Sequence, residues 1–162
     1  MSSALRAWVG LGANLGDPRA TLAAALDALA ALPGTRLAAQ SSIWRSAPVE
    51  ARGPDFLNAV AALDTTLDPP DLLAALQAIE ARHGRERPYH HAPRTLDLDL
   101  LLHGDNVLHT PALTLPHPRL HLRAFVLEPL AELAPGLVLP GLGPLAPWRA
   151  AAADQLVERL SA

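Results

Sequence analysis

The chain has 162 residues, half of them hydrophobic and 18% charged, and its formal net charge is −3. This length is typical of a single domain with a sizeable core, and the charge does not favour nucleic-acid binding. The sequence contains no cysteine and no lysine, which excludes disulfides, thiolate metal sites and lysine-based phosphate binding or catalysis. No segment has the length and apolarity of a membrane span or the pattern of a signal peptide, so we expect a cytoplasmic protein.

The first half of the sequence predicts a strand, a helix and two more strands. Residues 8–12 predict the first strand, and Asp17 followed by Pro18 is a typical helix start. The apolar positions after it recur at helical spacing as far as Pro33-Gly34. Residues 35–46 and 56–65 predict the next two strands, separated by a loop rich in proline and glycine.

The second half predicts a helix from Asp68 to Gly84, a polar loop over residues 85–94 and a strand from Thr95 onward. After a turn at residues 104–106, the pattern indicates a helix over 122–133 that includes Pro129, a short strand over 137–140 and a final helix over 144–160. The order β-α-β-β-α-β predicts an α+β sheet with helices on one face and additional C-terminal helices. We expect one domain over residues 1–162.

The strand that begins after Thr95 carries two carboxylates. Side chains alternate along a strand, so Asp97 and Asp99 share one face while the leucines between them share the other. At a rise of about 3.3 Å per residue, the two carboxylates start roughly 6.6 Å apart. A divalent cation would relieve their repulsion, and oxygen ligands favour Mg²⁺ or Mn²⁺. The alternative is a solvent-facing side of the strand that carries Asp twice.

Other polar residues allow two interpretations. The arginines and histidines of residues 85–94 form either an exposed charged loop or a lid that brings positive charge to phosphates. The adjacent His90 and His91 would diverge, which argues against a zinc site. Asn58 is either a turn or edge residue or an amide that reads a heterocycle edge. Gln77 and Glu80 are either solvated or part of a site.

Several segments, in order between residues 9 and 135, carry the motifs of a known family: 12–16, 48–58, 84–87, 93–99 and 116–119, followed by Arg123 and Phe125. On these residues the sequence resembles the 6-hydroxymethyl-7,8-dihydropterin pyrophosphokinase family of folate biosynthesis. Segment 93–99 is the most specific motif. The resemblance implies a ferredoxin-like fold and transfer of pyrophosphate from ATP to the hydroxymethyl group of a reduced pterin, leaving AMP.

The resemblance also implies residue roles. Two Mg²⁺ ions would be held by Asp97 and Asp99, with Arg85 and Arg94 as further catalytic groups. The ATP site would be lined by Gln77, Glu80, Arg87, Leu100, Thr114, His117 and Arg123. The pterin site would be lined by Ser46, Pro48, Val49, Phe56, Asn58, His91 and Phe125. Where the family commonly has a tryptophan that closes over the pterin, this chain has His91, with Tyr89 nearby.

The expected partners are therefore ATP and the pterin, with no nucleic acid and no membrane, and the chain is expected to be a monomer. Two other functions also use some of these features. A two-metal phosphodiesterase would use the paired aspartates, but it would need a basic surface. A non-catalytic ferredoxin-like module that binds a small ligand would explain the fold, but not the aspartates or the arginine-rich loop.

Overall fold

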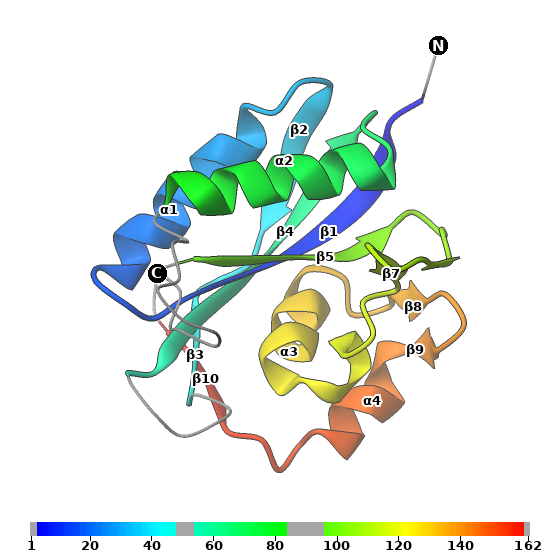
Figure 1. Cartoon of the computed structure of the whole chain (residues 1–162). Helices are drawn as coiled ribbons and strands as arrows, with labels where there is room; N and C mark the ends of the chain where they lie inside the picture. Colours follow the sequence, from blue (N-terminus) through cyan, green and yellow to red (C-terminus); the bar gives the residue numbers. More distant parts are fainter. Residues whose placement is uncertain (1–2, 48–53, 84–95, 161–162) are drawn as a thin grey trace.

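The computed structural model describes residues 3–47, 54–83 and 96–160 and folds them around one antiparallel sheet (Figure 1). The strand order is β10-β3-β4-β1-β5, and β2 pairs with β4 further along the same edge as β3. The strands are β1 (Leu5–Ala13), β2 (Thr35–Gln40), β3 (Trp44–Ser46), β4 (Phe56–Thr65), β5 (Asp97–His103) and β10 (Val157–Arg159). This central arrangement is the expected ferredoxin-like one.

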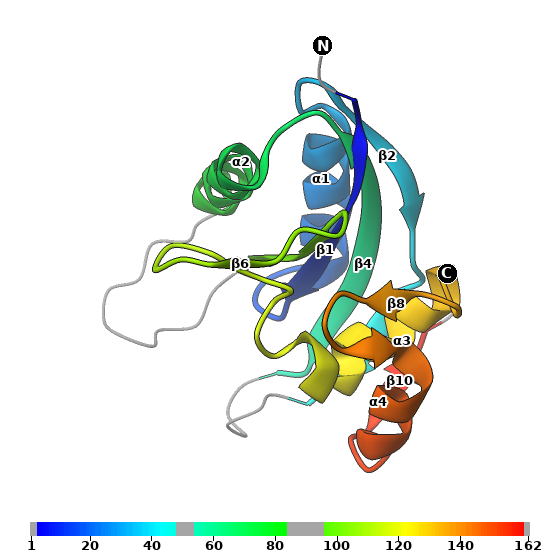
Figure 2. The same cartoon turned by 90° about the vertical axis from the view of Figure 1, so that its right-hand side faces the viewer.

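Two helices cover one face of the sheet, and the C-terminal helices cover the other (Figures 1 and 2). The helices are α1 (Pro18–Ala30), α2 (Pro69–Arg82), α3 (Ala124–Leu133) and α4 (Leu145–Ala151), with a 3-10 turn, η1 (Leu120–Leu122), before α3. Two small hairpins complete the described part: β6 (Leu108–His109) with β7 (Thr114–Leu115), and β8 (Val138–Leu139) with β9 (Gly143–Pro144). No helix in the described ranges is both long and apolar enough to span a membrane.

Each face of the sheet has its own hydrophobic core. On one face, Val9 and Leu11 of β1 pack with Leu22 of α1 and Leu76 of α2. On the other face, Trp8 packs with residues of β4, β5 and α3. The period of two along β1 therefore decides which side chains face α1 and α2 and which face α3.

The helix starts follow the sequence closely. The side chain of Asp17 accepts a hydrogen bond from the backbone N–H of Ala20 at 3.2 Å, and that of Asp68 accepts one from Asp71 at 2.9 Å. In both helices proline follows the cap, where its missing N–H costs no helical hydrogen bond. The helix expected to contain Pro129 is confirmed as α3.

Two predictions of secondary structure were wrong. The strand expected over residues 35–46 is divided into β2 and β3. Between them, the Oγ of Ser41 accepts the N–H of Val60 at 2.9 Å. The helix expected over residues 144–160 ends at Ala151. The chain then turns and adds β10 to the outer edge of β3. Leu156, within the range expected to be helical, is 90% exposed.

Candidate active site

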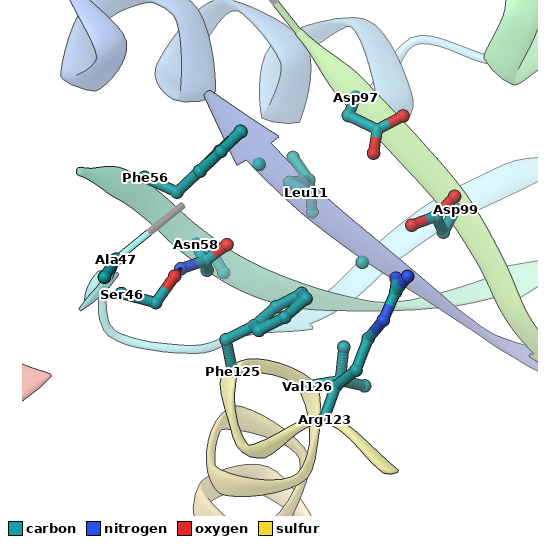
Figure 3. Close-up of a pocket in the computed structure, with 13 residues that line it drawn as sticks. Leu11, Ser46, Ala47, Phe56, Asn58, Asp97, Asp99, Arg123, Phe125 and Val126 are labelled. Carbon is teal, nitrogen blue, oxygen red and sulfur yellow. Dashed lines mark hydrogen bonds between the residues drawn. The ribbon is translucent and has the colours of Figure 1, made fainter. Parts of the chain in front are cut away.

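The paired aspartates of β5 lie opposite the two glycines of β1. Asp97 pairs with Gly12 and Asp99 with Gly10, so all four residues share the face of the sheet that α3 covers. Glycine leaves this part of the sheet without side chains, and a cavity of about 210 Å³ opens above it (Figure 3). The cavity is lined by Gly10, Leu11, Gly12, Ser46, Ala47, Phe56, Asn58, Ala59, Asp97, Asp99, Arg123, Phe125 and Val126.

One wall of this cavity is a polar pair on neighbouring strands. The side-chain amide Nδ2 of Asn58 donates to Ser46 Oγ at 2.7 Å, and both residues are buried. The side-chain oxygen of Asn58, Oδ1, lies 3.5 Å from the position that a Cβ on Gly12 would occupy. The amide is therefore oriented by Ser46, with its acceptor oxygen on the side of β1 and the cavity (Figure 3).

The opposite wall comes from the start of α3. Arg123 and Phe125 both line the cavity, and the guanidinium carbon of Arg123 lies 5.4 Å from the centre of the Phe125 ring. This distance suits a cation–π contact, which restricts the orientation of both side chains. Figure 3 shows the guanidinium extending toward the side of the cavity where Asp99 lies. The described residues of the site thus combine aromatic surfaces, one amide, two carboxylates and one guanidinium.

A second cavity, of about 240 Å³, shares the lining residue Asp99 with the first. It lies beside β5 and the β6–β7 hairpin and is lined by Leu73, Leu98, Asp99, Leu100, Pro111, Ala112, Leu113, Thr114, His117 and Pro118. Among the residues that the structure describes, only Asp99 lines both of these cavities. A group bound between the two would therefore lie beside the carboxylates.

His117 is uncharged at neutral pH. Burial lowers its pKa most, and the nearby positive charges of Arg123 and Arg119 outweigh the opposite influence of Asp97, so the pKa falls to about 4. Its Nδ1 accepts the backbone N–H of Arg119 at 3.1 Å, which leaves the ring proton on Nε2. That nitrogen lies 3.9 Å from Asp99 Oδ1. His117 therefore presents a neutral N–H donor beside the carboxylates.

Glu80 is not solvated, although that was one of its two interpretations. It is only 3% exposed, and one carboxylate oxygen accepts the backbone N–H of Leu98 at 2.9 Å. Leu98 lies between the two aspartates, so Glu80 joins α2 to the strand at the site. Gln77, one turn earlier on α2, is exposed.

The donor types at the site fit Mg²⁺. Asp97 and Asp99 supply hard oxygen ligands from one face of one strand, and the side chain of Asp99 is 32% exposed. Within the described ranges, no group of three or more Asp, Glu and His residues converges on a metal position. Mg²⁺ commonly takes one or two protein carboxylates and completes its shell with water and substrate phosphates.

The structure brings together many of the residues predicted for the site. Ser46, Phe56, Asn58 and Phe125 line the first cavity with the aspartates and Arg123. Leu100, Thr114 and His117 line the second. The predicted residues Pro48, Val49, Arg85, Arg87, His91 and Arg94, and Tyr89, lie outside the described residues.

Sequence reasoning gave no role in the cavity to Gly10 and Ala47. The spacing of Gly10 and Gly12 is a signal that could have identified the cavity floor, because residues two apart in a strand share a face. No comparable signal marked Ala47.

The chain was compared with known proteins. A family model described as 7,8-dihydro-6-hydroxymethylpterin-pyrophosphokinase (HPPK) matches residues 8–135. A 2-amino-4-hydroxy-6-hydroxymethyldihydropteridine pyrophosphokinase of Pseudomonas aeruginosa is 52% identical over 156 residues, which cover 96% of each chain. The protein of the same name from Haemophilus influenzae is 44% identical, and the match covers 84% of this chain and 86% of the Haemophilus chain.

Among solved structures, Plasmodium falciparum HPPK-DHPS with pteroate matches with a TM-score of 0.75 and 11% identity. The match covers 93% of this chain but only 43% of the Plasmodium chain, so this chain spans less than half of that protein. At this identity the likeness concerns the fold alone.

Proposed function

The chain belongs to the 7,8-dihydro-6-hydroxymethylpterin-pyrophosphokinase family, enzymes of folate biosynthesis that transfer pyrophosphate from ATP to hydroxymethyldihydropterin, and we propose that Asp97 and Asp99 support this transfer by binding Mg²⁺. The observation that carries the proposal is that Asp99 lines both cavities. A pterin in the first and a nucleotide in the second would meet at the carboxylates. The pterin hydroxyl oxygen attacks the β-phosphorus of ATP, the bond to the α–β bridging oxygen breaks, and AMP leaves.

The first cavity suits a flat, polar heterocycle. Phe56 and Phe125 offer aromatic surfaces, and the Oδ1 of Asn58 is available to accept a hydrogen bond from a ring N–H or amino group. Because Ser46 already holds the Nδ2 of Asn58, this acceptor is oriented before the ligand arrives. Pro48, Val49 and His91 complete the pterin site in this proposal.

The second cavity would take the nucleotide. Leu98 and Leu100 give it an apolar side, while Thr114 and His117 offer polar groups. The neutral His117 can donate from Nε2 to a phosphate oxygen without a proton being taken up from solvent. Gln77, Glu80 and Arg87 are further candidates for this site; Glu80 would act through the backbone of β5.

Charge neutralisation is the main requirement of phosphoryl transfer, because the protein forms no covalent bond to the transferred group. Asp97 and Asp99 would hold the two Mg²⁺ ions, which would supply positive charge to neutralise the phosphates of ATP. Arg123 extends its guanidinium into the same cavity and can pair with phosphate oxygens, and Arg85 and Arg94 are proposed to do the same. Phe125 restricts where that guanidinium can lie.

The test is to mix the protein with ATP, Mg²⁺ and 6-hydroxymethyl-7,8-dihydropterin and to separate the nucleotides by chromatography. AMP and the pterin diphosphate are expected in equal amounts. Formation of ADP would overturn the proposed transfer, and binding of both ligands without any turnover would favour a non-catalytic module. Hydrolysis of a phosphodiester instead would point to a two-metal phosphodiesterase.

The role of the carboxylates needs a matched set of variants. Asp97→Asn and Asp99→Asn keep the side-chain shape but weaken metal binding, and each should lower kcat by at least 100-fold, since loss of one transition-state donor costs about 3–4 kcal/mol. Asp105→Asn, an exposed residue in the turn after β5, serves as the control. Near-normal turnover of either site variant at limiting Mg²⁺ would refute the metal assignment.

The remaining properties follow from the same proposal. We propose a single domain that acts as a monomer in the cytoplasm and binds ATP and the pterin, with no nucleic acid. Sedimentation at working concentration checks the monomer. A mass of two chains that persists on dilution would overturn it.

A further inference from the structure

The amide of Gln155 bridges the backbone on both sides of Arg123. Its Oε1 accepts the N–H of Ala124 at 2.9 Å, and its Nε2 donates to the carbonyl of Leu122 at 2.7 Å. Gln155 comes from the segment between α4 and β10, so these two hydrogen bonds join parts of the chain that are more than 30 residues apart.

The start of α3 needs such a partner. Arg123 is the residue before the helix, and its own side chain makes no capping hydrogen bond. The first N–H groups of a helix lack partners within the helix, so the N–H of Ala124 must be satisfied from outside. Gln155 does this with its acceptor oxygen. At the same time its donor group fixes the carbonyl that precedes Arg123.

Gln155 is itself held from both directions along the chain. On the N-terminal side, its N–H donates to the carbonyl of Ala152, which is buried in the core on the α3 face. On the C-terminal side, Val157 pairs with Ser46, the residue that orients Asn58. The segment that carries Gln155 is thus attached to both walls of the first cavity.

We propose that Gln155 is a positioning residue that sets the orientation of Arg123, and with it Phe125, at the cavity. The inference rests on the proposed function, in which Arg123 contacts the phosphates. Gln155 lies beyond residues 8–135, which the family model matches, so the family match assigns it no role. Its effect on the reaction passes through the backbone of Arg123 rather than through contact with substrate.

The experiment is a double-mutant cycle with Gln155→Ala, Arg123→Ala and the variant that carries both. With Arg123 present, Gln155→Ala should lower kcat/KM about threefold to tenfold, the range expected for loss of hydrogen bonds that hold a catalytic group. In the Arg123→Ala background, the same change should have no further effect. The inference would be overturned if Gln155→Ala lowered kcat/KM equally with and without Arg123. It would also be overturned if Gln155→Ala had no effect with Arg123 present.

Two further measurements separate positioning from stability. The control Asp154→Ala changes the exposed neighbouring residue and should leave kcat/KM unchanged. Gln155→Glu keeps an acceptor for Ala124 but loses the donor to Leu122, so its kcat/KM should lie between wild type and Gln155→Ala. All variants should melt within a few degrees of wild type.

Hydrogen exchange gives a readout that does not depend on activity. The amide of Ala124 should exchange faster in Gln155→Ala than in wild type, with the interior of α3 unchanged. If the wild-type protein makes no AMP, the proposed function fails, but faster exchange at Ala124 would still establish the bridge. If AMP forms and neither exchange nor kcat/KM responds to Gln155→Ala, only the role of Gln155 is refuted.

Discussion

Glu80 and Leu98 join α2 to β5 between the two aspartates: the backbone N–H of Leu98 donates to the Glu80 carboxylate at 2.9 Å. Leu98 faces the core with α1 and α2, whereas Asp97 and Asp99 face the cavity beneath α3. A carboxylate on one side of the sheet therefore fixes the peptide that carries the site on the other side. The position of the aspartates thus depends on a buried residue outside the first cavity.

Replacing Glu80 tests this dependence. Glu80→Ala removes the acceptor for a buried N–H and should lower the free energy of unfolding by about 2 kcal/mol. Glu80→Gln keeps an acceptor oxygen and should cost less. Urea unfolding of both variants measures the difference, and the Ala variant should also lose turnover. Equal stability of the two variants would show that the hydrogen bond to Leu98 contributes little.

Filling the cavity floor should weaken pterin binding. A Cβ at Gly12 would lie 3.5 Å from Asn58 Oδ1 and 3.7 Å from Phe56, which is ordinary contact, so Gly12→Ala should fold normally. The larger Gly12→Val should raise the pterin Kd at least about tenfold, because its methyl groups occupy ligand space. Calorimetry with the pterin and with a non-hydrolysable ATP analogue measures both sites. Gly136→Val, where a Cβ meets nothing within 4 Å, is the control.

Ser46→Ala should loosen the Asn58 amide at the first cavity, where the proposed function places the pterin. Among the described residues, the change leaves Asn58 Nδ2 with a 3.5 Å contact to the carbonyl of Trp44, and it should cost about 1–2 kcal/mol of stability. The pterin Kd should rise because the Asn58 oxygen is no longer oriented. Chemical unfolding and calorimetry check the two effects, with the exposed Ser3→Ala as the control. An unchanged Kd would mean that Ser46 has no part in orienting the amide.

Glu132 should make stability depend on acid pH. Burial raises its pKa, but hydrogen bonds from the Ser42 N–H, the Trp44 indole and the Ser42 hydroxyl, together with the charge of Arg159, bring the pKa below its ordinary value of 4.5. A carboxyl whose folded pKa is lower than its unfolded pKa stabilises the fold above the unfolded value. This contribution is lost as pH falls through the folded pKa.

The variant Glu132→Gln should therefore be less stable than wild type at pH 7, by about 1–2 kcal/mol. The difference in unfolding free energy between the two proteins should shrink as pH falls below about 4.5. Wild type then loses the stabilisation from the ionised Glu132, which the variant lacks at every pH. Unfolding in urea between pH 7 and pH 3 measures both curves. Parallel curves over the whole range would contradict the assigned role of Glu132.

The sequence predicted those parts of the site that depend on local periodicity. The alternation along β5 predicted that Asp97 and Asp99 share one face, and the capping residue Asp17 predicted where α1 begins. The motifs of the family included some of the residues that line the two cavities, among them Asn58, Phe125 and His117. These features depend on residues close in sequence or on segments with a recognisable pattern.

Long-range polar contacts could not be predicted in this way. The indole N–H of Trp44 reaches Glu132 across 88 positions, and neither residue has a neighbour that indicates the pairing. The apolar residues near the C-terminus suggested a helix, but their pattern did not indicate that the edge of β3 was open for another strand. Glu80 was similarly ambiguous, because its burial depends on an N–H of β5 rather than on its place in α2.

The strand β10 has a consequence for self-association. It covers the outer edge of β3, so the new edge of the sheet is only three residues long and carries Glu158 and Arg159, which pair with Arg45 and Ser42. Short, charged edges discourage strands of other molecules from adding to a sheet. A truncated chain lacking β10 would expose the unpaired N–H and carbonyl groups of β3, and aggregation would begin beside the cavity wall that Ser46 and Asn58 form.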